Sequence, residues 1–245
     1  MSDAGKLPVV LIPGLQSDRR SWAFQIPFLE GLGHPVIVPE GQHRLGSIAE
    51  MAECVAAQLP VSAHILAWSM GGYIACRLLE ICPERFASLG MIATSARPED
   101  ATRTAQRRLA MDQARREGMA ATHRANLAMS CHDVSRLSPA LLADLITMAE
   151  EIGTEAYLAQ QEAIIARPDG RPALAAWNGP LMILVGEEDV TTPPDRAEEM
   201  HALRPDSRLF RLPGAGHCAP FEVPDQVNAI LAGWLEEVEQ GRVVG

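Results

Sequence analysis

The segment 63–82 constrains the fold more than any other part of this chain. A run of mostly apolar residues ends at Trp68, Ser69 follows, and Gly71 and Gly72 open a stretch of helix-forming residues. A strand that turns sharply into a helix has this pattern, because only small residues fit where the turn brings the two elements together. The turn would present the Ser69 hydroxyl above a sheet. Because a free serine hydroxyl is a poor nucleophile, the pattern indicates catalysis only alongside a base and an orienting acid.

A candidate acid lies beyond a second apolar run, 181–185. This run is short and bounded by proline and glycine, which is typical of a buried strand, and Asp189 follows it in a loop. Functional groups of α/β sheets lie just beyond the carboxyl ends of parallel strands, where Asp189 is expected. Glu99 and Asp100, after the preceding strand, are alternative acids. Other carboxylates near Asp189 also compete for the role: Glu187, Glu188 and Asp195.

The candidate base is His217, in a loop of small residues after the run 208–212 and before a closing helix. No other histidine lies in a loop of this kind. His217 would take the Ser69 proton as the hydroxyl attacks an acyl carbon, and return it to the leaving alcohol. Asp189 would hold the imidazole in the productive tautomer.

The order Ser…Asp…His is that of α/β hydrolases, and the chain resembles this family over nearly its whole core. The opening segment 9–15 (VVLIPGL), the turn around Ser69, the Asp189 loop and the His217 loop carry the resemblance. It implies an α/β-hydrolase fold: a mostly parallel sheet of about six strands, with helices on both faces and an inserted helical lid.

An oxyanion also needs two fixed donors. The resemblance indicates the backbone N–H of Met70 and that of Leu15, with Gln16 as an alternative to Leu15. Similar enzymes often carry His-Gly where this chain has Pro13 and Gly14. Pro13 cannot form the hydrogen bonds of a histidine, so we expect other contacts to hold this oxyanion loop.

Alternating apolar runs and helical patterns predict the order of elements. Strands are expected at 9–12, 35–39, 63–68, 89–94, 181–185 and 208–212, and helices at 22–32, 48–59, 70–82, 196–203 and 223–238. The region between has no strand pattern and is expected to form helices at 99–117, 119–130, 139–151 and 154–166. The chain would then divide into a first core part (1–96), a helical lid (97–179) and a second core part (180–245).

Four apolar side chains are candidates for an acyl pocket. They are Trp22 and Trp68 near the oxyanion loop and the serine turn, and Met111 and Met129 on the lid. Methionine adapts to irregular apolar groups, although each of these residues could equally be an ordinary core residue.

The first lid helices are basic within an acidic protein. Seven arginines and four acids lie between Arg97 and Arg124. This pattern indicates either a solvated helix face or a docking surface for a carboxylate, a phosphate or an acidic carrier protein.

Composition excludes several classes of function. A net charge of −10 disfavours nonspecific binding to nucleic acid and to anionic membranes. The five cysteines are odd in number and scattered, without a metal-ligand spacing, so we expect reduced thiols and a cytoplasmic location. We expect neither a metal nor a cofactor. The sequence predicts no oligomeric state.

These features favour a serine hydrolase that cleaves a carboxylic ester. The motifs 68–72 and 216–221 resemble those of pimeloyl-carrier-protein methyl ester esterases. The expected partner is therefore a small-molecule ester, and an ester that is linked to an acyl carrier or that bears a carboxylate is one option. The same three residues also serve enol-lactone and C–C bond hydrolases. A ligand receptor on a hydrolase scaffold is the alternative of another class.

Overall fold

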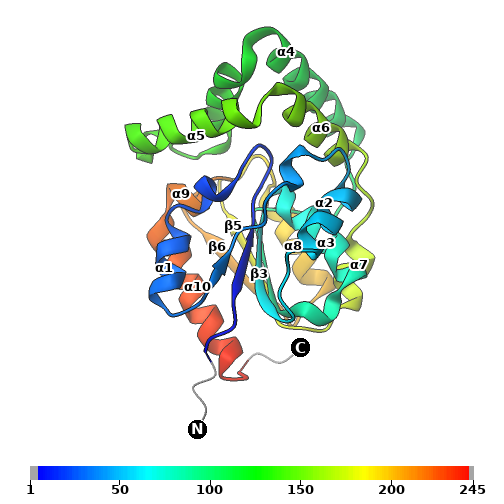
Figure 1. Ribbon diagram of the computed structural model, residues 1–245, viewed down its shortest axis with the longest axis vertical. Helices are drawn as coiled ribbons and strands as arrows, with labels where there is room; N and C mark the ends of the chain where they lie inside the picture. Colours follow the sequence, from blue (N-terminus) through cyan, green and yellow to red (C-terminus); the bar gives the residue numbers. More distant parts are fainter. Residues whose placement is uncertain (1–4, 243–245) are drawn as a thin grey trace.

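The computed structural model describes residues 5–242, and its sheet has six strands. The sheet lies at the centre of the molecule (Figure 1). All strands in it are parallel, in the order β2-β1-β3-β4-β5-β6. Their bounds are β1 (Val9–Ile12), β2 (Val36–Ile37), β3 (Ala63–Trp68), β4 (Phe86–Ile92), β5 (Leu181–Gly186) and β6 (Arg208–Leu212). The expected α/β-hydrolase architecture is confirmed.

The central strands are buried on both faces, which explains their continuous apolar runs. Every residue of β1, β3 and β5 is buried, whereas the edge strands β2 and β6 are partly exposed. Two expected strand bounds were wrong. The strand expected at 35–39 pairs only over Val36–Ile37, and β4 begins at Phe86, earlier than expected, because its first residue pairs with Ala63 of β3.

Helices cover both faces of the sheet (Figure 1). On one face lie α1 (Gln25–Gly31), α9 (Ala219–Glu222) and α10 (Pro224–Glu239), and on the other α2 (Ile48–Ala56), α3 (Met70–Ile81), α7 (Arg171–Ala176) and α8 (Pro194–Leu203). The helix expected at 22–32 is instead a short 3₁₀ turn followed by α1. The sequence analysis did not predict α7 or α9.

Three helices lie beyond the carboxyl edge of the sheet, at the top of Figure 1: α4 (Ala101–Ser130), α5 (Pro139–Ile152) and α6 (Thr154–Ile165). Gly118 interrupts α4 with a φ of 77°, so α4 corresponds to the two helices expected at 99–117 and 119–130. Glycine adopts this conformation without steric cost, and the chain changes direction there. Within residues 97–179, α7 differs from these helices because it packs on α3 and α8 beside the sheet.

Between residues 5 and 242, no helix has both the length and the apolar character that crossing a bilayer requires. The longest, α4, is rich in charged residues.

Candidate active site

Ser69 lies at the sharp turn from β3 into α3. Its φ of 55° is unusual for a residue with a side chain, and the surrounding contacts enforce it. The Ser69 N–H donates to the Ile92 carbonyl (3.0 Å), and its own carbonyl accepts from the Thr94 hydroxyl (2.6 Å). A Cβ on Gly71 would overlap the Ile12 carbonyl oxygen, and one on Gly72 would overlap the Thr94 side chain. The glycines noted in the sequence are therefore required by the close approach of helix and strands.

Three side chains from distant loops form a hydrogen-bonded series. His217 Nε2 lies 2.8 Å from Ser69 Oγ, and His217 Nδ1 lies 2.9 Å from Asp189 Oδ2. Asp189 Oδ1 accepts the backbone N–H groups of Thr191 and Thr192, each at 2.8 Å, and its Oδ2 also accepts the Thr192 hydroxyl at 2.9 Å. These three hydrogen bonds hold the Asp189 carboxylate independently of its contact with the imidazole, and that contact orients the imidazole toward Ser69.

Asp189 is buried, yet its carboxyl group has a lowered pKa. Burial alone would raise its pKa, but the charge of His217 and the hydrogen bonds from His217 and Thr192 outweigh that effect and lower the pKa of Asp189 below its usual value. The alternative acids lie elsewhere. Glu99 pairs with Arg167 at 3.0 Å, and Asp100 caps the start of α4.

The two expected oxyanion donors lie at the same edge of the sheet. Met70 is the first residue of α3, so its N–H has no acceptor within the helix. Leu15 lines the cavity above Ser69. The Gln16 N–H, by contrast, already donates to Gln160 Oε1 at 2.7 Å, which favours Leu15 over Gln16 as the second donor.

Gln16 and Gln160 provide the contacts that Pro13 cannot. Gln160 lies on α6 and donates from its amide to the His43 carbonyl while it accepts the Gln16 N–H. The Gln16 side chain contacts His123 on α4 (3.3 Å) and the Ala149 carbonyl on α5 (3.4 Å). The oxyanion loop is therefore bound to all three helices above the sheet. Nothing in the sequence links Gln16 to these three helices, because each of its partners on them lies more than a hundred positions away.

The loop that carries His217 is held by Trp68, which was expected only as a pocket residue, and by two groups that the sequence analysis did not single out, the Ser130 carbonyl and Glu222. Trp68 Nε1 donates to the His217 carbonyl (3.0 Å), and the His217 N–H donates to the Ser130 carbonyl (2.8 Å). Buried Glu222 accepts the backbone N–H groups of Gly216 (2.9 Å) and Asp133 (2.6 Å). These bonds tie the histidine loop both to β3 and to the end of α4.

A cavity of about 730 Å³ lies between Ser69 and the helices above it. Trp68 and Met129, two of the four expected pocket residues, line it. Other apolar side chains in its wall come from α4, α5, α6 and α9: Leu127, Leu145, Met148, Tyr157, Ile164 and Phe221. Its size and mainly apolar wall suit a small or medium acyl group.

Comparison with known proteins identifies the family of this chain. Residues 9–230 match the model of the alpha/beta hydrolase family. This chain belongs to that family. The pimeloyl-[acyl-carrier protein] methyl ester esterase of Edwardsiella ictaluri is 29% identical to it over 95% of both chains. A component of the acetoin cleaving system of Pseudomonas putida, a dihydrolipoyllysine-residue acetyltransferase, is 25% identical over 95% of this chain, which spans 64% of that protein.

Solved structures resemble this hydrolase over almost its whole length. A thermophilic esterase from Thermogutta terrifontis has 27% identity and a TM-score of 0.80, with 96% of this chain and 91% of that chain covered. The enol-lactonase from Burkholderia xenovorans, at 23% identity and a TM-score of 0.83 over 96% and 94% of the chains, shares the fold. The chain is therefore an esterase-like hydrolase.

Two of the expected pocket residues lie outside the cavity wall of this hydrolase. Trp22 is fully buried, and its ring packs edge-on against Trp68, with centroids 6.5 Å apart, behind the site. Met111 on α4 is 1% exposed and is not among the residues that line the cavity. Both are core residues, a role that sequence cannot distinguish from pocket lining because either one requires an apolar side chain.

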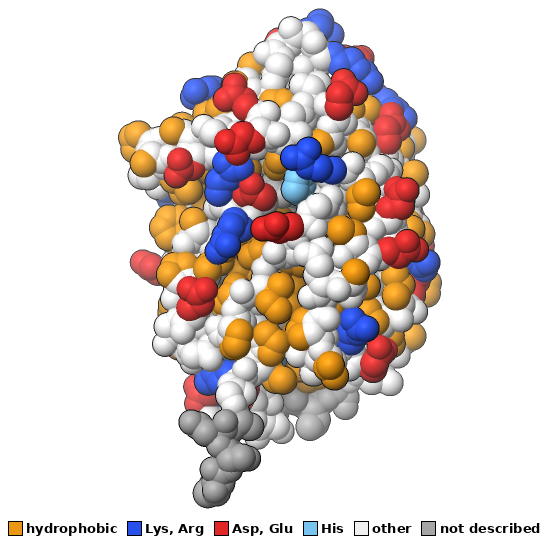
Figure 2. Space-filling model, viewed as in Figure 1, with side chains coloured by type: hydrophobic (Ala, Val, Ile, Leu, Met, Phe, Trp, Pro, Cys, Tyr) orange, Lys and Arg blue, Asp and Glu red, His pale blue; other side chains and the backbone are white. Residues whose placement is uncertain are grey.

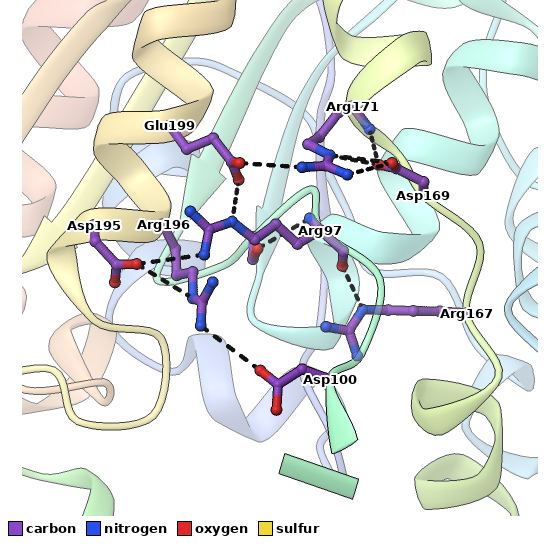
Figure 3. Close-up of polar contacts among 9 residues, drawn as sticks. Arg97, Asp100, Arg167, Asp169, Arg171, Asp195, Arg196 and Glu199 are labelled. Atoms are coloured by element: carbon purple, nitrogen blue, oxygen red, sulfur yellow. Dashed lines mark hydrogen bonds and ion pairs between the residues drawn. The ribbon is translucent and has the colours of Figure 1, made fainter. Parts of the chain in front are cut away.

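Carboxylates neutralise much of the basic character of α4. Arg97, which precedes α4 in the chain, contacts Glu199 and also Asp195 (3.5 Å), as Figure 3 shows. Three further arginines have acidic partners: Arg107 with Glu99, Arg108 with Glu162 and Arg115 with Asp112. In Figure 2 basic and acidic side chains are interspersed over the upper part of the molecule. The paired arginines do not form a uniformly positive surface.

Arg103 differs from these arginines. Its guanidinium donates to the Thr191 carbonyl, and among residues 5–242 it has no carboxylate within ion-pair distance. It lines both the large cavity and a neighbouring cavity of about 320 Å³. Arg196 also lines the smaller cavity and has only long contacts, 3.9 Å to Asp100 and 3.7 Å to Asp195 (Figure 3).

Proposed function

We propose that this hydrolase cleaves carboxylic esters through an acyl-enzyme formed on Ser69. The observation that carries the proposal is the contact of His217 Nε2 with Ser69 Oγ at 2.8 Å, while Nδ1 contacts Asp189 at 2.9 Å. His217 accepts the hydroxyl proton as Ser69 attacks the acyl carbon, and then protonates the leaving alcohol. In the second half, His217 deprotonates a water molecule that attacks the acyl-enzyme, and Ser69 is regenerated as the acid leaves.

Asp189 orients His217 and stabilises its charged form, and the backbone N–H groups of Met70 and Leu15 stabilise the oxyanion. A donor of this kind contributes about 3 kcal/mol in the transition state. Within the segment 97–179, expected to be the lid, α4, α5 and α6 cover the acyl cavity and act as the lid, whereas α7 packs beside the sheet. Its tie to the oxyanion loop through Gln16 and Gln160 supports this role, since lid and loop would then be positioned together.

Ser69→Ala tests the proposal directly. We expect kcat/KM for short p-nitrophenyl esters to fall by at least about a thousandfold, because the variant lacks the nucleophile. Ser62→Ala, a partly exposed serine before β3, is the matched control and should keep full activity. A fluorophosphonate probe should label wild type and the control but not Ser69→Ala. Equal turnover by Ser69→Ala would overturn the proposal, and labelling of Ser69 without turnover of any ester would favour a receptor.

We further propose that the preferred ester carries an acidic group on its acyl side. Arg103 supports this, because it lines both cavities and lacks a carboxylate partner among the described residues. A guanidinium beside an apolar acyl cavity can pair with a carboxylate of a dicarboxylic half-ester or of an enol-lactone.

A series of acyl esters with and without a terminal carboxylate tests this preference. We expect the acidic members to be better substrates, and Arg103→Gln to lower kcat/KM for them about tenfold while leaving neutral esters unchanged. Arg115→Gln, on the same helix but away from both cavities, is the control. An equal loss for neutral and acidic esters would contradict the proposal.

A further inference from the structure

Two buried histidines and a carboxylate meet at the amino-terminal edge of the sheet. His64 lies near the start of β3, His34 lies in the loop before β2, and Glu239 ends α10. Their ligand-type atoms all lie within 4.8 Å of one another. Ser69 follows the other end of β3, five residues away, which places this cluster about 16 Å from the proposed catalytic site. We propose that His34, His64 and Glu239 bind a transition-metal dication of the Zn²⁺ type.

The second nitrogen of each imidazole already has a partner. His34 Nδ1 lies 2.8 Å from the Leu7 carbonyl, which can only accept, so Nδ1 carries the proton and Nε2 presents a lone pair. His64 Nδ1 lies 2.9 Å from the Ser88 hydroxyl. Metal-binding histidines characteristically hydrogen-bond through their other nitrogen, because that bond fixes the tautomer and the ring orientation.

His64 Nε2 is the atom that most needs a ligand. His64 is 1% exposed, and Nε2 has no hydrogen-bond partner among residues 5–242. A buried polar atom without a partner is costly, and a metal ion would satisfy it. Burial, and then the neighbouring His34, lower the pKa of His64 to about 4, so the ring is neutral near pH 7. A neutral imidazole is the form that binds a metal.

A cation already occupies the mouth of the cluster. Lys6 Nζ lies 3.5 Å from His34 Nε2 and 3.2 Å from Glu239 Oε2. The Lys6 side chain is 42% exposed, so it can turn into solvent when a metal ion takes its place. Glu239 Oε1 lies 3.7 Å from His34 Nε2, and its side chain is 29% exposed, so the carboxylate can move onto the ion.

The donor set selects the class of metal. Two imidazoles and one carboxylate suit Zn²⁺ and its transition-metal neighbours, whereas Mg²⁺ and Ca²⁺ prefer oxygen ligands. The three protein ligands leave a fourth position for water, on the side from which Lys6 departs. The ion would join the end of α10 to the sheet, so its expected effect is on stability.

Titration of the chelator-stripped full chain with ZnCl₂, followed by calorimetry and by thermal unfolding, tests the inference. We expect one Zn²⁺ per chain at this cluster and a raised Tm, with no such response to MgCl₂. Glu239→Gln keeps the shape of the side chain on an exposed helix end and should weaken binding at least tenfold. Lys6→Gln removes the competing cation and should strengthen binding about tenfold.

Two further variants identify the ligands. His64→Gln should abolish the response, and the visible spectrum of bound Co²⁺ should lose its imidazole-dependent bands. His132→Gln removes an exposed histidine outside the cluster and should leave affinity unchanged. Absence of binding by wild type would overturn the inference. The inference would also be overturned if Glu239→Gln and Lys6→Gln both left the Zn²⁺ affinity unaltered, because the ion would then lie elsewhere. Both variants alter exposed side chains, so this result stands even if His64→Gln does not fold.

Discussion

Beyond the carboxyl end of β3, His217 contacts a carboxylate whose side chain is wholly buried, whereas at the amino end His34 contacts one that is 29% exposed. Asp189 accepts two backbone N–H groups and a hydroxyl, and each bond holds it in one position. Glu239 is instead paired with the exposed side chain of Lys6. An imidazole and a carboxylate therefore meet at both ends of the sheet. The carboxylate is held in one position at the carboxyl end, whereas at the amino end it can exchange its Lys6 partner for another cation.

This difference separates two uses of an imidazole beside a carboxylate. Proton transfer needs an imidazole oriented before substrate arrives, because reorganising the site during the reaction would add to the barrier. Ion binding needs side chains that can close around the ion and release their previous partner. The surroundings of the carboxylate, more than the histidine itself, decide which use is possible.

The largest expected effect comes from breaking the fixed end. Asp189→Asn retains the shape of the side chain but favours the wrong tautomer of His217, so kcat/KM for a p-nitrophenyl ester should fall about 10⁴-fold. Asp144→Asn, exposed on α5, is the control and should be fully active. A loss of less than about tenfold in Asp189→Asn would mean that Asp189 does not orient the base.

At the other end, His64 should make stability depend on pH. Burial lowers its pKa to about 4 in the folded protein, below the value of about 6.5 for an unfolded chain, so the unfolded state binds more protons between these values. The contribution of His64 to the free energy of unfolding is therefore fully present above pH 6.5 and is lost as the pH falls toward 4. It amounts to about 2 kcal/mol between pH 7 and pH 5.

Urea unfolding at pH 7 and pH 5, in the presence of a chelator, measures this dependence. His64→Gln should reduce the difference in unfolding free energy between the two pH values by about 2 kcal/mol. The exposed His132→Gln should not alter it. An equal pH dependence in wild type and His64→Gln would show that His64 titrates as it does in the unfolded chain.

The smallest expected effect concerns the hydroxyl that supports the fixed carboxylate. Thr192→Val removes the donor to Asp189 Oδ2 but keeps the backbone N–H bond, so kcat should fall about tenfold with KM unchanged. Thr192→Ser restores the hydroxyl and should restore kcat. If both variants were equally impaired, packing of the Thr192 methyl group, and not its hydroxyl, would be responsible.

Much of the fold could be predicted because the central strands are short, apolar and separated by breakers. Four of the six strands have the expected bounds to within one residue. The bounds of β2 and β4 could not be predicted, since each strand extends only as far as its backbone pairs with the neighbouring strand, and the sequence of the strand itself does not show that pairing. The short helix α7 has no amphipathic pattern long enough to detect, and it exists because Leu174 packs into the core formed with α3 and α8.

The proximity of Ser69, Asp189 and His217 could also be anticipated, because the carboxyl ends of parallel strands meet at one edge. The pocket wall could not be predicted in the same way. Trp22 and Met111 have the right chemistry but are buried outside the cavity wall, while Gln16 and Gln160 are ordinary polar residues until folding brings them together.

By itself the sequence determined the order of strands and helices, the strained serine turn and the chemical groups available at each loop, because these depend on local patterns of apolar and small residues. Only the tertiary structure decided which arginines are neutralised, which amide holds the oxyanion loop, and that His34 and His64 face Glu239. Those outcomes depend on distances between segments far apart in the chain, and burial then sets the cost of every polar atom left without a partner.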